Sequence, residues 1–212
     1  MTPRNTRIKI CGNTRVGDAL LAERLGADFI GLIFARQSPR HVSVDRAHAI
    51  AASLSRARPV GVFVDQDYEE TLEIAEKCGL WGIQHYRNFP EGFRDFTYIL
   101  GLRMGEPGMD DPNWPDDWAS LACDYLLIDT YDKKAHGGTG KTFDWDRIPA
   151  MARDRTFLAG GLGPHNICAA AKQGVYALDL SSSVETSPGI KDPDQLEILF
   201  STFQICDDMD QN

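Results

Sequence analysis

Two residues of the chain stand where they could exchange protons with a bound molecule. Cys11 closes the apolar segment 8–11, and Asp129 closes the apolar segment 125–129. A thiolate can accept a proton and a carboxylic acid can donate one, so the pair suits general acid–base catalysis. Each residue also has a simpler interpretation, because a buried cysteine is usually inert packing and an aspartate after a strand often caps the next turn.

Small residues follow two later apolar segments and predict a phosphate site. Gly160 and Gly161 stand in one of these stretches, and Ser181, Ser182 and Ser183 make up the other. Small side chains let backbone N–H groups come close to phosphate oxygens. A Gly-Gly pair alone is weak evidence, since tight turns also use it, but the two stretches together favour phosphate binding.

Arg40 and the stretch after Asp129 add further candidates. Arg40 could bind an anionic group, although most arginines simply lie on the surface. The stretch 130–142 is rich in Gly and Lys, which suits a mobile cover over a site. Its Gly-Lys-Thr at 140–142 resembles the end of a nucleotide-binding P-loop. Because Ala135 occupies the position of the required first glycine, we reject nucleotide binding there.

These residues need a scaffold that brings distant segments together, and the hydrophobic pattern supplies one. Apolar, β-rich segments of four to six residues recur, and stretches with helical periodicity follow them. This alternation predicts repeated βα units around a parallel sheet. The expected strands are 8–11, 29–34, 59–64, 82–85, 97–102, 125–129, 156–159 and 177–180. The clearest expected helices are 16–25, 45–53, 68–78, 164–171 and 193–203.

Eight strands in 212 residues predict one α/β domain, a (β/α)8 TIM barrel with eight parallel strands. In that fold the functional residues lie at the carboxyl ends of the strands and in the loops that follow. We expect the barrel to cover 1–205, with an acidic C-terminal tail over 206–212. Prolines and glycines interrupt the pattern in 89–122, so the helices after the fourth and fifth strands should be short or irregular.

The overall composition excludes several classes of protein. A formal net charge of −9 leaves no basic surface for nucleic acid, so an anionic substrate needs a local positive potential such as the amides at a helix start. The apolar runs are too short to span a bilayer, and the first residues lack the apolar core of a signal peptide. These features predict a cytoplasmic protein without membrane contact.

The cysteines give a further expectation. There are five, an odd number with irregular spacing, and no two form a CxxC pair. This pattern argues against a disulfide framework and against a zinc site. We therefore expect no metal, and no cofactor is needed for simple proton transfer.

Several segments together resemble the phosphoribosylanthranilate isomerase family of tryptophan biosynthesis. They cover most of the chain in the order of the family's own blocks, and they are KICGNTRVGDA, GADFIGLIFARQSPRHVS, LLIDT, GGTGKTFDW, LAGGLGPHN and DLSSSVETSPGIKD. Two positions depart from the family. The family usually has Gln-Leu-His-Gly where this chain has Gln-His-Tyr-Arg at 84–87, so His85 stands one place early and should point to the other face of its strand. Ser183 replaces a usual glycine and would be strained if that position needs a positive φ.

The resemblance implies an aldose–ketose isomerase that converts N-(5'-phosphoribosyl)anthranilate to 1-(2-carboxyphenylamino)-1-deoxyribulose 5-phosphate by an Amadori rearrangement. It implies that Cys11 is the general base and Asp129 the general acid. Alternation places Lys9 on the same face as Cys11, where a positive charge would favour the thiolate. The residues implied to bind the substrate are Arg40 at the anthranilate carboxylate and Gly160, Gly161, Ser181 and Ser182 at the phosphate, with His85 as a further candidate contact.

Two other functions stay open on the sequence alone. One is another phosphosugar isomerase on the same barrel, which the displaced His85 favours. The other is a non-catalytic phosphosugar-binding barrel, against which the presence of both Cys11 and Asp129 speaks. In every case we expect a small phosphosugar as the partner, and either a monomer or a homodimer as the assembly.

Overall fold

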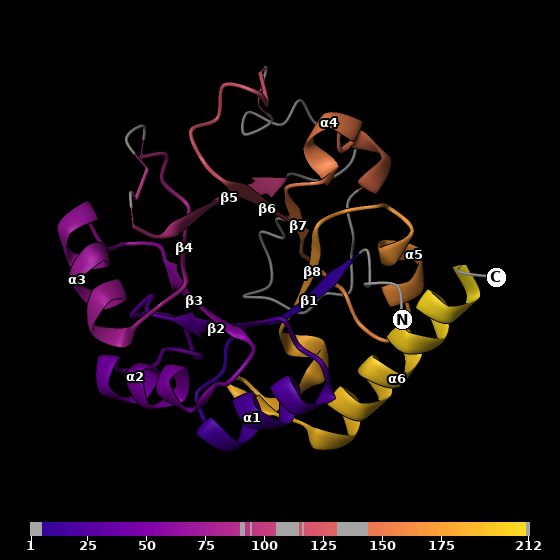
Figure 1. Cartoon of the computed structure of the whole chain (residues 1–212), viewed down its shortest axis with the longest axis horizontal. Coiled ribbons are helices and arrows are strands. Elements are labelled where there is room, and N and C mark those ends of the chain that lie inside the picture. Colours follow the sequence, from indigo (N-terminus) through magenta and orange to yellow (C-terminus); the bar gives the residue numbers. More distant parts are fainter. Residues whose placement is uncertain are drawn as a thin grey trace.

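Eight strands close into a parallel barrel, and the helices lie around its outside (Figure 1). The computed structural model describes residues 6–89, 92–93, 95–104, 115, 117–130 and 144–210, without the side chains of 130 and 207–210. Each strand pairs with its sequence neighbour, and the last pairs with the first. The strands are β1 (Arg7–Ile10), β2 (Phe29–Ile33), β3 (Arg58–Phe63), β4 (Gly82–His85), β5 (Thr97–Met104), β6 (Tyr125–Thr130), β7 (Thr156–Leu158) and β8 (Ala177–Leu180). The expected TIM barrel is confirmed.

The helices begin and end at residues that satisfy their terminal backbone groups. Side chains of Ser43 and Asp67 accept hydrogen bonds from backbone amides at the starts of α2 and α3. Gly26 ends α1 in the left-handed conformation, with a φ of 116°. The α-helices are α1 (Val16–Leu25), α2 (Val44–Ser53), α3 (Tyr68–Cys78), α4 (Ala150–Arg153), α5 (Ile167–Ala171) and α6 (Pro193–Asp210). Two 3-10 helices, η1 (Trp145–Arg147) and η2 (Ser182–Val184), and a small hairpin of β9 (Glu185–Ser187) and β10 (Ile190–Lys191) complete the described elements.

Two helix boundaries differ by more than one residue from the expectation. The helix expected from 164 begins only at Ile167, because the side chain of Asn166 binds the amide of Gly163 and holds the preceding residues in a turn. The last helix was expected to end at Phe203 but α6 continues to Asp210, so Cys206 belongs to the helix. Between β4 and β6, the residues that the structure describes form no helix, in keeping with the interrupted pattern there.

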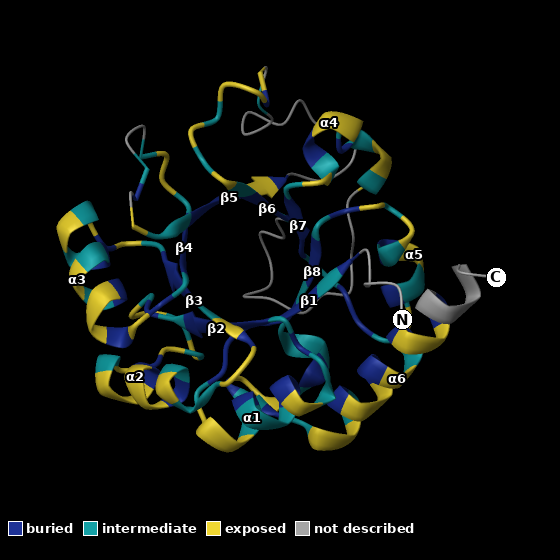
Figure 2. Ribbon diagram, viewed as in Figure 1, coloured by how far each residue is buried: buried dark blue, intermediate teal, exposed yellow. Residues whose placement is uncertain are grey.

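The core has an inner and an outer part, because successive side chains of a strand point to opposite faces. Inside the barrel, Phe29, Leu127 and Phe157 pack together, and strand register places Lys9 and Asp129 on the same inner faces. Residues on the other face pack beneath the helices. Figure 2 shows the consequence, with dark blue buried strands inside a ring of helices whose outer faces are exposed. None of the helices in the described part of the chain is long and apolar enough to cross a bilayer.

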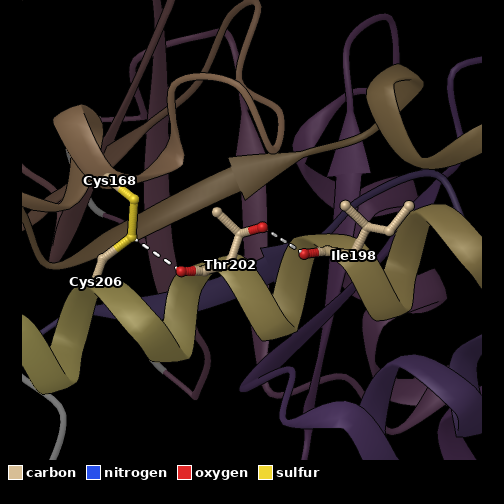
Figure 3. The surroundings of a disulfide bond; sticks show 4 residues. All are labelled: Cys168, Ile198, Thr202 and Cys206. Atoms are coloured by element: carbon tan, nitrogen blue, oxygen red, sulfur yellow. Dashed lines mark hydrogen bonds between the residues drawn. A yellow bond between two sulfur atoms is a disulfide. The ribbon is translucent and has the colours of Figure 1, made fainter.

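One disulfide bond contradicts the expectation from cysteine spacing. Cys168 of α5 is bonded to Cys206 of α6, with a Cα–Cα separation of 5.5 Å (Figure 3). The two residues are 38 positions apart, and they meet only because α5 and α6 pack side by side. Cysteine spacing carries no information about that packing, which is why the prediction was wrong. Cys11, Cys78 and Cys123 are free.

Candidate active site

Cys11 lies directly after β1, at the carboxyl end of the barrel, and its side chain faces the interior. Its amide donates to the carbonyl of Leu180 at 2.7 Å, which extends the β1–β8 pairing by one residue. Only 7% of the residue is exposed. Gly31 of the neighbouring strand makes room for it, since a Cβ at that position would stand 2.7 Å from the Cys11 sulfur. A glycine inside an apolar strand often marks such a close approach, so this signal was present in the sequence and was missed.

A buried ion pair lies below Cys11 in the barrel. Lys9 Nζ donates to both carboxylate oxygens of Asp179 at 3.0 Å. Burial alone would lower the pKa of Lys9, but Asp179 and Cys11 together outweigh burial and raise this pKa, so the ammonium persists. Burial also raises the pKa of Cys11, and the positive charges of Lys9 and Lys191 act against that rise without cancelling it. Lys9 thus lowers the pKa of Cys11, as expected from the sequence. Burial raises this pKa by more, however, and favours the thiol.

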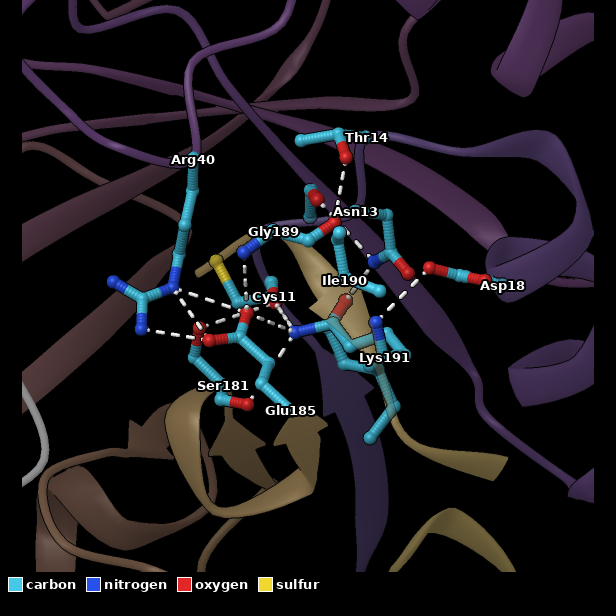
Figure 4. Close-up of polar contacts among 12 residues, drawn as sticks. Cys11, Asn13, Thr14, Asp18, Arg40, Ser181, Glu185, Gly189, Ile190 and Lys191 are labelled. Atoms are coloured by element: carbon cyan, nitrogen blue, oxygen red, sulfur yellow. Dashed lines mark hydrogen bonds and ion pairs between the residues drawn. The ribbon is translucent and has the colours of Figure 1, made fainter. Parts of the chain in front are cut away.

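Arg40 is not an ordinary surface arginine, since it forms a partly buried ion pair beside Cys11 (Figure 4). Its Nε lies 3.0 Å from both carboxylate oxygens of Glu185, and its Nη2 donates to Oε2 at 2.7 Å. The stem of Arg40 passes over Gly12, where a Cβ would come within 2.7 Å of Arg40 Cδ and where φ is +76°. The loop after β2 is therefore fitted closely against the turn that follows Cys11.

Lys191 of the β9–β10 hairpin joins this cluster and is almost completely buried, with a side chain that is 1% exposed. Its Nζ donates to the carbonyl of Cys11 at 2.5 Å, to Glu185 at 2.8 Å and to the carbonyl of Ser181 at 3.3 Å. Burial lowers the pKa of Lys191, and the charge of Glu185 acts in the opposite direction. The hairpin thus reaches back to the carboxyl end of β1, which no sequence pattern had indicated.

The loops after β7 and β8 lie against each other, as a shared phosphate site requires. Gly160 and Gly161 have φ values of 91° and 64°, conformations that glycine adopts without steric cost. A Cβ on Gly163 would come within 3.1 Å of the Cβ of Ser183, which shows how closely the loops approach. The amides of Ser182 and Ser183 open η2, so no acceptor within that helix is available to them.

The expected strain at Ser183 is absent. Among the described residues, only glycines have positive φ, so Ser183 fits this backbone without the penalty that its replacement of a glycine suggested. Its hydroxyl is buried and has no hydrogen-bond partner in the described part of the chain. A buried hydroxyl next to a candidate phosphate site is available to a bound anion.

Asp129 lies near the end of β6 on the inner face, with Arg103 of β5 as its register partner. Tyr86, which follows β4, extends toward both, and the guanidinium of Arg103 lies 4.4 Å from the centre of its ring. Burial raises the pKa of Tyr86 well above its ordinary value, and the negative charge of Asp129 adds to this effect, so the phenol keeps its proton. The stretch 131–142, including the expected cover, lies outside the described residues.

His85 does not join this site. It is fully buried and its ring lies parallel to that of Phe63, on the outer face of the barrel as alternation predicted. Its Nδ1 accepts from the amide of Arg87 at 3.0 Å, which fixes the tautomer whose Nε2 donates to the carbonyl of Gln66 at 3.0 Å. Burial lowers the pKa of His85, in keeping with this neutral form. With both ring nitrogens occupied, His85 is withdrawn as a substrate contact.

Comparison with known proteins identifies the family. The family profile described as N-(5'phosphoribosyl)anthranilate (PRA) isomerase matches residues 8–202. The chain belongs to the phosphoribosylanthranilate isomerase family. It is 42% identical over 192 residues to the N-(5'-phosphoribosyl)anthranilate isomerase of Nitrosococcus oceani, covering 88% of this chain and 92% of that one.

Solved structures of phosphoribosylanthranilate isomerases have the same fold. The enzyme from Thermus thermophilus superposes with a TM-score of 0.81 at 34% identity, covering 94% of this chain and 99% of that one. A second one was solved in complex with reduced 1-(O-carboxyphenylamino)-1-deoxyribulose 5-phosphate. It has a TM-score of 0.73 at 28% identity and covers 94% of this chain and 98% of that one.

The protein is therefore an isomerase of tryptophan biosynthesis that acts on N-(5'-phosphoribosyl)anthranilate. This activity replaces both alternatives left open by the sequence, another phosphosugar isomerase and a non-catalytic binding barrel. Within this phosphoribosylanthranilate isomerase, the structure adds residues that the sequence had not brought to the site. They are Gly31, Tyr86, Arg103, Asp179, Glu185 and Lys191.

Proposed function

We propose that Cys11 is the general base and Asp129 the general acid of the isomerisation. The observation that supports this proposal most strongly is their placement: both lie at the carboxyl end of the barrel and face its interior, from β1 and β6, with the site loops between them.

The proposed chemistry needs one proton donor and one acceptor. Asp129 donates a proton to the ring oxygen as the C1–O bond breaks, and the nitrogen lone pair forms the C=N bond of a protonated Schiff base. Cys11, as a thiolate, removes the proton from the second sugar carbon. Those electrons form a C1=C2 bond, and the C=N electron pair returns to nitrogen to give an enolamine. Loss of the enol proton and protonation of C1 then yield the ketone.

The protonation state of Cys11 decides which form of the enzyme reacts. Because burial raises the pKa of Cys11, the resting enzyme holds a thiol, and the reactive thiolate becomes more abundant as the pH rises. Lys9 lies on the same inner face and stabilises the thiolate when it forms. The ammonium of Lys9 is itself fixed by Asp179, so its charge is held in place rather than mobile.

We further propose that the two anionic ends of the substrate are held apart. The phosphate lies among Gly160, Gly161, Ser181 and Ser182, where small residues and the start of η2 offer amides. The anthranilate carboxylate lies at Arg40. The ligand of the solved relative carries a carboxyphenyl group and a 5-phosphate, and these are the two groups that this arrangement would bind.

A structure of this chain with the same reduced product analogue would test the assignment. We expect the phosphate against Gly161 and Ser182, the carboxylate on Arg40, and the second sugar carbon within van der Waals contact of the Cys11 sulfur. A phosphate bound elsewhere, or a sugar held away from Cys11, would overturn it. Sedimentation would decide separately whether the assembly is a monomer or a homodimer; one solved relative consists of monomers generated from the dimeric isomerase of Thermotoga maritima.

A further inference from the structure

Glu185 makes polar contacts with three other residues of the site, although it takes no part in the proposed reaction. Its carboxylate accepts from Arg40, from Lys191 and from the amide of Gly189, and its side chain is 3% exposed. Burial would raise the pKa of Glu185, but the hydrogen bond from Arg40 and the charge of Lys191 outweigh it and lower the pKa. Glu185 therefore stays ionised at neutral pH, between two cations.

The contact with Glu185 uses only one side of the Arg40 guanidinium. A guanidinium offers two edges for parallel hydrogen bonds to a carboxylate, the Nε–Nη2 edge and the Nη1–Nη2 edge. Glu185 occupies the first edge, through Nε and Nη2. No contact within the described chain uses Nη1, so the second edge remains open to a ligand.

The charge of the cluster also favours an incoming anion. Arg40 and Lys191 carry two positive charges, and Glu185, which lies in direct contact with both, carries one negative charge. A carboxylate on the open edge of Arg40 would balance the remaining positive charge. Without Glu185, the charges of Arg40 and Lys191 would oppose each other in a poorly solvated place, and Arg40 could swing toward solvent.

The hairpin that carries Glu185 is itself tied to the catalytic strand. Thr14 donates to the carbonyl of Gly189 at 2.5 Å, and the amide of Lys191 donates to Asp18 at 3.0 Å. Lys191 also reaches the carbonyl of Cys11 (Figure 4). The position of Glu185 is thus fixed relative to the proposed base before any ligand arrives.

We propose that Glu185 is a positioning residue that turns the Nη1–Nη2 edge of Arg40 toward the aromatic carboxylate of the substrate, and that it thereby makes the enzyme selective for carboxylated substrates. This inference rests on the proposed role of Arg40. Glu185 does not touch the substrate itself. It orients the flexible side chain of Arg40 before the substrate binds, so that substrate binding does not have to restrict the motion of Arg40.

The test compares the natural substrate with N-(5'-phosphoribosyl)aniline, which lacks the carboxylate. Glu185→Gln keeps the shape but removes the charge, and it should lower kcat/KM for the carboxylated substrate about 10- to 100-fold, mainly through KM, as expected for losing hydrogen bonds between charged groups. The value for the aniline analogue should change far less. Glu185→Asp keeps the charge on a side chain shorter by one methylene and should give an intermediate loss of preference.

A matched control is available on the surface. Glu70 accepts from Arg36 at 2.6 Å in an exposed pair, so Glu70→Gln makes the same chemical change away from the site and should leave both substrates unaffected. Thermal unfolding of every variant shows whether the fold persists. Should Glu185→Gln fail to fold, the Glu185→Asp comparison decides the question.

Arg40→Ala separates failure of this inference from failure of the proposed function. If Arg40→Ala abolishes the preference for the carboxylate while folded Glu185 variants keep it, the role of Arg40 stands and the role of Glu185 is overturned. Equal losses for both substrates in the Glu185 variants would also overturn it, since a merely structural role predicts that result. If Arg40→Ala keeps the preference, Arg40 is not the carboxylate contact and both assignments fall.

Discussion

The two ends of the barrel interior are filled by different kinds of buried side chain. At the amino end, Phe29, Phe157, Tyr125 and Tyr176 pack ring against ring, with centroid separations between 4.3 and 6.2 Å. At the carboxyl end, buried polar and charged side chains take their place, and Lys9, Glu185 and Lys191 are held there by hydrogen bonds between charged groups. The same strand alternation builds both ends, so stability and chemistry are separated along the barrel axis.

The largest expected effect comes from removing proton chemistry at the carboxyl end. Cys11→Ser replaces the thiol with a far less acidic hydroxyl, and Asp129→Asn removes the acidic proton, each with little change of shape. Each should lower kcat by roughly 10² to 10⁴ with a smaller change in KM, because general acid or base catalysis contributes about that much. The loss of substrate fluorescence measures the rate. A folded Cys11→Ser enzyme with near-parental kcat would show that Cys11 is a packing residue and not the general base.

At the amino end of the barrel, we expect a substitution to lower stability and leave activity almost unchanged. Phe157 is fully buried and contacts the rings of Phe29 and Tyr125. Phe157→Ala should lower the free energy of unfolding by about 3–5 kcal/mol, the usual range for such a cavity, while kcat per folded molecule stays close to parental. Denaturant unfolding and the fluorescence assay measure the two quantities. A large fall in kcat at unchanged stability would show that the two ends are not separable.

Gly31 links packing and chemistry at one position. A Cβ there would stand 2.7 Å from the Cys11 sulfur and 2.9 Å from its Cα, so Gly31→Ala must displace the proposed base. We expect a loss of about 1–3 kcal/mol of stability from overpacking and a fall in kcat of about tenfold or more. Gly17→Ala in α1 is the matched control, because a Cβ there has no atom within 4 Å and alanine favours the helix. Similar kcat values for the two variants would contradict this account.

The pH dependence of kcat/KM tests the electrostatic environment of Cys11 at the carboxyl end of the barrel. Because the reaction needs the Cys11 thiolate and a protonated Asp129 together, kcat/KM should have a bell-shaped pH profile, and the raised pKa of Cys11 should place the limb that belongs to the thiol above the ordinary thiol pKa of about 8.5. The raised pKa has the opposite effect on folding: it favours the neutral thiol, so its contribution to stability is complete below the unfolded thiol pKa and is lost as the pH rises through the folded pKa. Cys11→Ser should lose the limb that belongs to the thiol. If the limb that this substitution removes is centred near neutral pH in the parent, Lys9 outweighs burial.

The smallest expected effect concerns Ser183. Its buried hydroxyl has no partner within the described chain, so a bound phosphate would supply an acceptor. Ser183→Ala should raise KM a few-fold, as expected for one hydrogen bond of about 1 kcal/mol, and leave the unfolding temperature unchanged or slightly higher. Competition by inorganic phosphate gives an independent measure. An unchanged KM and phosphate affinity would place this hydroxyl outside the site.

Sequence reasoning succeeded where the signal was periodic and failed where it depended on distant packing. Strand alternation correctly placed His85 on the outer face, because the pleat is a local property of the backbone. The disulfide between Cys168 and Cys206 was missed because it depends on how two helices pack. The proposed roles of Cys11 and Asp129 stay predictions, since the structure gives their placement and not their reactivity.

The sequence by itself determined the barrel, the face on which each strand residue lies and the end at which the reactive side chains gather, because hydrophobic period and strand direction are encoded locally. Only the tertiary structure decided which of those side chains meet. Arg40 and Glu185 are 145 positions apart, and their ion pair exists because two loops from separate βα units converge on one rim. Such convergence is set by the closure of the whole barrel, which no short segment of the chain contains.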